Sequence, residues 1–163
     1  MNKPLNPVCT LDALTCEPFK QGTDYESLDA GIAEQIGLTQ IGAAYTQVPP
    51  GKSSCPFHVH HVEDEMFVIL EGEGEYRFGS HCYKVKAGDI LGAPRGGPEY
   101  AHKLVNTGSA TLKYLAISSK SDIEVCEYPD SGKFLVNHRG SNALRYIGRL
   151  ENALDYWDGE EGA

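Results

Sequence analysis

Apolar and polar residues alternate through the middle of the chain, from about residue 38 to residue 118. A period of two is typical of β-strands with one buried face, because successive side chains point to opposite sides of a sheet. The first such segment, residues 38–48, ends at Pro49, Pro50 and Gly51, which favour a turn. Further strand-sized segments follow between turn residues, at residues 57–61, 65–72, 75–79, 81–88, 89–94, 102–108 and 111–118.

This succession of about eight short strands predicts an all-β domain, either a sandwich or a small barrel. The 18 glycines and 9 prolines fit that expectation, because short strands need many turns. Gly79 and Ser80 separate two of the segments and predict a β-hairpin. Periodicity alone leaves the choice between sandwich and barrel open.

A chain of 163 residues is expected to form a single domain, here across residues 1–163 with a β core at about residues 38–118. Residues 1–37 lack clear alternation and predict an N-terminal arm, in which residues 26–36 could form a short turn of helix. Residues 119–163 predict a C-terminal arm.

Within the C-terminal arm, the segment from Tyr128 to Gly132 contains Pro, Asp, Ser and Gly and predicts a turn. The apolar spacing between Leu144 and Trp157 fits two alternatives. One is a helix, and the other is an extended segment that packs the single tryptophan against the core.

The formal net charge of −9 and the pI of about 5.1 disfavour nucleic acids and anionic membranes as partners, because both would repel an acidic surface. No apolar run approaches the length of a membrane span, and the N-terminal residues do not resemble a signal peptide. The five cysteines lack CxxC spacing and do not suggest a disulfide framework. Together these features predict a cytoplasmic protein.

Three histidines carry the strongest chemical signal. His58 and His60 are two residues apart in a predicted strand, so their side chains are expected on one face, where they could bind one metal ion. His102 begins a later predicted strand and is a third candidate ligand. The alternative is that the first two histidines are ordinary packed or surface residues.

A carboxylate ligand is expected from the acidic run of Glu63, Asp64 and Glu65. If Phe67 and Ile69 face the interior, Glu65 shares their face and Asp64 does not. Glu65 is therefore the predicted ligand, against the alternative that the whole run is solvated. Imidazole and carboxylate donors suit zinc, iron, manganese, nickel or copper, so one divalent transition metal is expected without further identification.

Two segments of the chain resemble the two conserved motifs of the cupin family. The first motif is matched by Gly51, His58, His60, Glu65 and Gly72, and the second by Gly88, Pro94, Gly96, His102 and Asn106. Five residues separate Gly96 from His102, which is more than the family pattern has. The resemblance implies a double-stranded β-helix, or jelly-roll, barrel in which His58, His60, Glu65 and His102 hold the metal.

Cupin chemistry implies a metal-dependent enzyme of dioxygenase, isomerase, decarboxylase or lyase type that acts on a small organic molecule. The alternatives are a non-catalytic module that binds a small ligand and a domain whose metal is structural. A substrate pocket is expected to have apolar walls drawn from the aromatic residues of the strands. These candidates are Tyr45, Phe57, Phe67, Tyr76, Tyr100 and Tyr114. A homodimer is also expected, because cupin barrels commonly pair through sheet edges and terminal arms.

Overall fold

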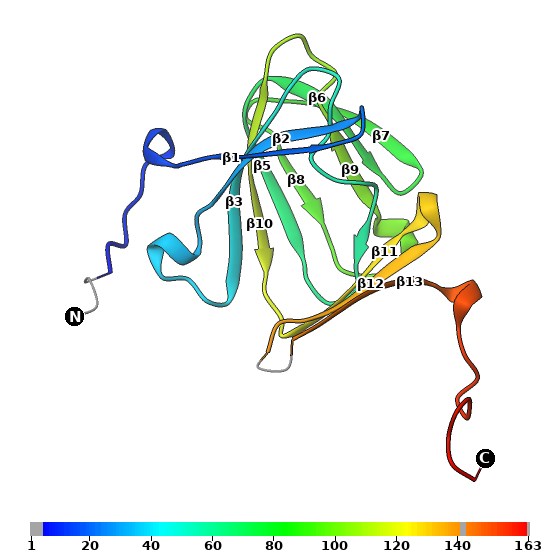
Figure 1. Cartoon of the computed structure of the whole chain (residues 1–163). Coiled ribbons are helices and arrows are strands. Elements are labelled where there is room, and N and C mark those ends of the chain that lie inside the picture. Colours follow the sequence, from blue (N-terminus) through cyan, green and yellow to red (C-terminus); the bar gives the residue numbers. More distant parts are fainter. Residues whose placement is uncertain (1–4, 141–142, 163) are drawn as a thin grey trace.

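The computed structural model describes residues 5–140 and 143–162, and its regular elements there are β-strands and short 3-10 helices (Figure 1). The strands are β1 (Glu17–Gln21), β2 (Tyr25–Gly31), β3 (Ile41–Val48), β4 (Val59–His60), β5 (Glu65–Glu71), β6 (Glu73–Phe78), β7 (His81–Lys86), β8 (Ile90–Ala93), β9 (His102–Val105), β10 (Leu112–Ser119), β11 (Ile123–Tyr128), β12 (Lys133–His138) and β13 (Leu144–Arg149). The 3-10 helices are η1 (Leu11–Ala13), η2 (Glu34–Ile36), η3 (Pro98–Tyr100), η4 (Pro129–Ser131) and η5 (Leu150–Asn152).

The strands form three antiparallel sheets that curve around a shared interior (Figure 1). The largest has the order β1-β2-β3-β10-β5-β8, the second β13-β12-β11-β4 and the third β7-β6-β9. The predicted all-β jelly-roll fold is therefore confirmed, although the hydrogen-bonded sheets of the described residues do not close into one continuous barrel. No helix in residues 5–140 or 143–162 is long and apolar enough to cross a membrane.

Strand β10 lies at the centre of the largest sheet, where Ala116 is paired with Ala44 of β3 on one side and Phe67 of β5 on the other. Alternate residues of these strands face inward, so Phe67, Ile69 and Tyr114 are buried. They belong to one apolar cluster that also contains Val48, Tyr76, Val85, Leu91, Ala93, Leu104 and Leu112. The predicted inward orientation of Phe67 and Ile69 is thus confirmed.

The hairpin predicted at Gly79 and Ser80 joins β6 to β7, with Phe78 paired to His81 across a two-residue loop. Gly79 has a positive φ of 55° while Ser80 does not, as in a type II′ turn. A Cβ at Gly79 would lie 2.5 Å from the Glu99 carbonyl oxygen, so this position requires glycine for steric reasons as well.

Both predicted arms contain strands. Strands β1 and β2 extend the largest sheet through the pairing of β2 with β3, so the helical turn expected from residue 26 is wrong up to Gly31. In the C-terminal segment, β11 to β13 form a sheet with β4. The end of the chain forms β13, the 3-10 helix η5 and turns instead of the α-helix that the apolar spacing allowed. Trp157 packs edge-on against Tyr156 and remains 62% exposed, so it is not packed on the core.

Candidate metal centre

The four residues predicted as metal ligands converge inside the fold. One ligand atom from each of His58, His60, Glu65 and His102 can be chosen so that all four lie within 4.8 Å of one another. Glu65 Oε2 lies 3.0 Å from His102 Nε2, 3.6 Å from His60 Nε2 and 3.9 Å from His58 Nε2. Ligands that surround a transition metal at about 2.0–2.2 Å are roughly 3 Å apart, so this donor set fits one ion.

His102 reaches the cluster because its backbone pairs with that of His58. The His58 amide donates to the His102 carbonyl at 3.1 Å, and the His102 amide donates to the His58 carbonyl at 2.7 Å. The extra residues before His102 form η3 and do not disturb this pairing. The bridge fixes the two rings at a centroid distance of 4.6 Å.

The outer ring nitrogens of two histidines donate to backbone carbonyls. His58 Nδ1 lies 2.9 Å from the Pro56 oxygen, and His102 Nδ1 lies 3.3 Å from the Tyr100 oxygen. A carbonyl only accepts hydrogen bonds, so each Nδ1 carries the proton and each Nε2 lone pair is left for the cluster. This is the arrangement that a metal site needs from its histidines.

The cluster perturbs the acid–base properties of its members. Burial alone would raise the pKa of Glu65, but the adjacent imidazoles of His102 and His60 hold it well below its usual range. Burial would lower the pKa of His60, yet contacts with Cys126 and Glu65 outweigh it and raise this pKa to about 9. For His102, burial is the leading cause and lowers the pKa. The carboxylate is thus ionised and available as a ligand at neutral pH.

Two residues next to the cluster were not predicted from the sequence. Glu124 and Cys126 lie on β11, which pairs with β4 beside His60. Cys126 Sγ lies 3.3 Å from His60 Nδ1, and Glu124 Oε1 lies 3.8 Å from the same atom. Together with His60 they form a second group whose donor atoms lie within 4.8 Å of one another.

The acidic run that supplies Glu65 is not uniformly solvated. Glu63 is buried and pairs with Arg139, while Ser121 N donates to it at 2.7 Å. Asp64 is exposed and accepts a hydrogen bond from the Arg95 amide at 2.9 Å. The three neighbouring acids therefore have three different roles, and strand alternation correctly selects Glu65 as the one in the cluster.

Half of the predicted pocket aromatics lie near the cluster. The Phe67 and Tyr76 rings lie 5.7 Å and 6.2 Å from the His102 ring, and Tyr114 packs on Phe67 at 5.8 Å. Tyr76 and Tyr114 are buried, which raises the pKa of both phenols. These three side chains form an apolar wall behind His102.

The other three predicted aromatics are placed differently. Tyr45 is buried on β3, and Phe57 lies beneath the Arg77 guanidinium, which is 3.5 Å from the ring centroid. Tyr100 is exposed and packs on Phe78 at 6.0 Å. No ring contact joins any of these three to a cluster histidine among the residues that the structure describes.

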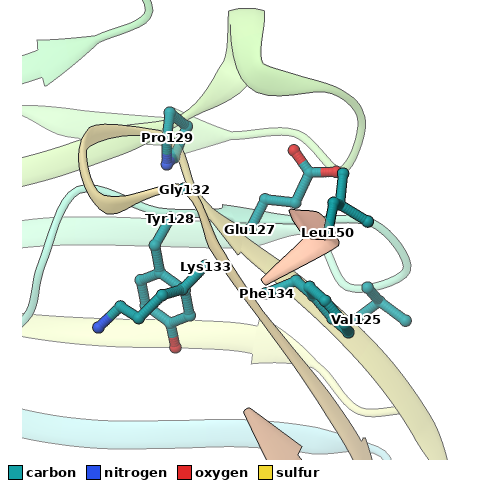
Figure 2. Close-up of a pocket in the computed structure, with 8 residues that line it drawn as sticks. All are labelled: Val125, Glu127, Tyr128, Pro129, Gly132, Lys133, Phe134 and Leu150. Atoms are coloured by element: carbon teal, nitrogen blue, oxygen red, sulfur yellow. The ribbon is translucent and has the colours of Figure 1, made fainter. Parts of the chain in front are cut away.

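An open cavity of about 250 Å³ lies on β11 and β12 (Figure 2). Its walls are mostly apolar and comprise Val125, Glu127, Tyr128, Pro129, Gly132, Lys133, Phe134 and Leu150. None of the four cluster residues lines it, but Tyr128 also stacks on His58 at a centroid distance of 6.2 Å. A single side chain therefore separates this cavity from the cluster.

Asn106, the last residue of the second motif, is fully buried and structural. Its side-chain nitrogen donates to the carbonyls of Val48 and Ala110, each at 2.8 Å, and its oxygen accepts from Gly108 N at 3.0 Å. It therefore holds the turn between β9 and β10, as expected for a residue that orders a strand end rather than binding substrate.

Comparison with known families agrees with this geometry. Residues 44–118 match the family described as Cupin domain. These residues therefore have the sequence pattern of a cupin domain. An uncharacterized protein of Methanocaldococcus jannaschii is 28% identical to this chain over 127 residues, which span 76% of the chain and 90% of that protein. An oxalate-binding protein of Thermotoga maritima is 36% identical over 74 residues, which span 45% of the chain and 58% of that protein.

Solved structures share the fold of this chain over most of its length. A sugar phosphate isomerase from Silicibacter pomeroyi superposes with a TM-score of 0.78 at 20% identity, covering 93% of this chain and 98% of that one. A protein from Thermotoga maritima described as a predicted oxalate decarboxylase superposes with a TM-score of 0.60 at 26% identity, covering 70% of this chain and 99% of that one.

Proposed function

We propose that this cupin holds one divalent transition metal at His58, His60, Glu65 and His102, and that it is an isomerase or decarboxylase acting on a small, oxygen-rich organic anion. The observation that carries the proposal is the convergence of four donor atoms, with two of the three imidazoles fixed by backbone carbonyls in the protonation state that a metal requires. Zinc, iron, manganese, nickel and copper all accept this donor set.

A catalytic role is favoured over a structural one by the chemical type and the exposure of the ligands. A structural zinc site is closed by four ligands and is usually rich in cysteine, whereas these four donors include three histidines and one carboxylate. The side chains of His58, His60 and Glu65 remain 12–17% exposed, so the site is accessible from one side. A metal here supplies Lewis-acid polarisation of a substrate oxygen.

The charge of the site favours an anionic substrate. Neutral histidines and one ionised Glu65 leave a divalent ion with one net positive charge, which attracts a carboxylate or a polyoxygenated anion. Two structurally similar proteins are named for anions of this class: a sugar phosphate isomerase and a predicted oxalate decarboxylase. Phe67 and Tyr76 provide the apolar wall beside His102, as expected of a small-ligand site.

A second candidate function is binding without turnover. The Thermotoga maritima relative that is 36% identical over part of the chain is named an oxalate-binding protein. The Tyr76 hydroxyl beside His102 is not free for proton transfer, because it already donates to the Gly92 carbonyl at 2.9 Å. A binder would hold oxalate or a similar anion at the metal, and no product would form.

Metal analysis and turnover assays together test the proposal. The purified protein should contain about one transition metal ion per chain, and the variant His58→Ala/His60→Ala should lose it. His61→Ala is the matched control, because His61 is exposed and contacts Glu127 rather than the cluster. Full metal occupancy in the double variant would refute the site.

The metal-loaded protein is then assayed with aldose and ketose phosphates, whose interconversion is followed by NMR. A second assay uses oxalate as the substrate and measures the release of carbon dioxide. Turnover that disappears in the double variant and persists in His61→Ala supports an enzyme. Calorimetric binding of oxalate without product would support the binding function and refute the catalytic one.

We further propose that the chain is a cytoplasmic homodimer. All five cysteines are free in the described part of the chain, which fits a reducing compartment. The segment after β13 exposes Leu150, Leu154 and Tyr156 by about 80% each, which is unusual for a chain that stays monomeric. Light scattering should give twice the chain mass, and removal of residues 150–163 should shift it toward the monomer.

A further inference from the structure

The three histidines of the metal centre differ in what lies behind them. His58 and His102 each donate from Nδ1 to a backbone carbonyl. His60 faces no carbonyl at this position, and its Nδ1 lies 3.3 Å from Cys126 Sγ and 3.8 Å from Glu124 Oε1. Side chains of β11 therefore lie behind His60 at the place where backbone carbonyls lie behind His58 and His102.

Glu124 is held in place by the loop that joins two of the ligands. It is 1% exposed, and its Oε1 accepts hydrogen bonds from the amides of His61 at 3.1 Å and Val62 at 3.3 Å. Its other oxygen, Oε2, is buried and has no hydrogen-bond partner among the residues that the structure describes. An unpaired buried carboxylate oxygen destabilises the fold, so its presence beside a metal ligand calls for a functional reason.

We propose that Glu124 and Cys126 are positioning residues that hold His60 with a proton on Nδ1 and its Nε2 lone pair directed at the metal. The inference rests on the metal site proposed above. The sulfur accepts the Nδ1 hydrogen bond, and the carboxylate favours the same proton electrostatically while its two amide bonds fix the chain between His60 and Glu65. The pair thereby sets both the tautomer and the orientation of His60.

A second cation bound between His60, Glu124 and Cys126 is a less suitable explanation. That cation would need Nδ1 of His60 while the first ion uses Nε2, so the imidazole would have to lose its last ring proton. Glu124 Oε1 is also engaged by two amides. One ion per chain is therefore expected, and the stoichiometry distinguishes the two arrangements.

Zinc affinity in matched variants tests the inference. Zinc dissociation constants are measured by competition with a chromophoric chelator for the wild type, Glu124→Gln, Cys126→Ala and Cys126→Ser. Glu124→Gln and Cys126→Ala should weaken zinc binding by about 10- to 100-fold, as is typical when the partner behind a ligand is lost. Cys126→Ser keeps an acceptor and should restore binding to within a few-fold of the wild type.

The control is Glu127→Gln, on the same strand, where the carboxylate is 38% exposed and pairs with His61. It should bind zinc as the wild type does. A long-range proton–nitrogen NMR correlation provides a readout that a general loss of stability would not change. Recorded on the metal-free protein at a pH above about 9, where His60 is neutral, it should show His60 protonated at Nδ1 in the wild type and an increased share of the Nε2 tautomer in Cys126→Ala.

Three results would overturn the inference: zinc affinity within twofold of the wild type in both Glu124→Gln and Cys126→Ala, two zinc ions per wild-type chain, or a His60 tautomer that does not change. A wild-type protein that binds no zinc or other transition metal would instead refute the proposed metal site. The tautomer measurement on the metal-free protein would still decide the role of Glu124 and Cys126.

Discussion

The buried ion pair between Glu63 and Arg139 closes the loop that connects two of the proposed ligands. Glu63 lies between His60 and Glu65 in the sequence, and both of its oxygens contact the guanidinium of Arg139, with Nη2 to Oε2 at 3.2 Å. Ser121 N donates to the same carboxylate at 2.7 Å. We predict that this pair makes a larger contribution to stability than any exposed pair of the protein.

The magnitude follows from the exposure of the two partners. Removing one partner of a fully buried pair destabilises a protein by about 3–5 kcal/mol, and an exposed pair contributes about 0–1 kcal/mol. The Glu63 side chain is 4% exposed and that of Arg139 is 34% exposed, so the pair lies between these limits. The variant Arg139→Met, which keeps the aliphatic stem, should lower the free energy of unfolding by about 2 kcal/mol.

A double-mutant cycle in urea measures the coupling directly, with Glu63→Gln and Arg139→Met as the single variants of the metal-free protein. We expect a coupling energy of about 1–2 kcal/mol. The control cycle uses Arg77 and Asp130, which form a bidentate pair at 2.7 Å and 3.0 Å with side chains 39% and 54% exposed. A coupling for Glu63 and Arg139 that does not exceed the control would refute the argument from burial.

Three further predictions concern the core, a buried hydroxyl and acid stability. Ile69→Ala should lower the free energy of unfolding by about 2–5 kcal/mol in urea, because Ile69 is 1% exposed; a loss below about 1 kcal/mol would contradict its place in the core. Tyr114→Phe removes the 2.8 Å hydrogen bond to Ser54 and should lower Tm, with a loss of about 1 kcal/mol; an unchanged Tm would contradict it. Hydrogen bonds from Arg77 lower the pKa of Asp130 below its ordinary 3.8, so the ionised pair stabilises the fold above that pH. The difference in free energy of unfolding between the wild type and Asp130→Asn should therefore be smaller at pH 3 than at pH 7.

Most strands between residues 38 and 118 were predictable because they have one buried face. Phe67 and Ile69 on β5, and Leu112 and Tyr114 on β10, are buried while their sequence neighbours are more exposed. A sequence of this kind carries the two-residue period in its apolar residues. The same alternation selected Glu65 from three consecutive acidic positions, and the structure places it in the cluster.

The edge strands β1 and β13 were missed because they lack a buried face. Every residue of β1 is exposed, and β13 is exposed except for one intermediate position. Such strands are held by backbone hydrogen bonds to β2 and β12, and that pairing leaves no apolar period in the sequence.

Strand β11 was missed for a different reason, and it carries Glu124 and Cys126. Its alternation is inverted, because Glu124 and Cys126 are buried while Ile123 is 54% exposed. A carboxylate that faces inward on a strand is itself a signal, since local rules of burial are broken most often at functional sites. Because residues 119–163 predicted an arm and not a strand, Glu124 and Cys126 were not expected to lie beside His60.

The burial of Glu124 on β11 is not explained by a contribution of its charge to the stability of the fold. A neutral side chain of the same shape at position 124 is expected to be no less stable, because the buried Oε2 atom of Glu124 has no hydrogen-bond partner among the described residues. Glu124→Gln should therefore leave the metal-free protein as stable as the wild type or make it more stable. Weaker metal binding without loss of stability would show that the carboxylate acts on His60, since a residue that served packing alone would lose both together.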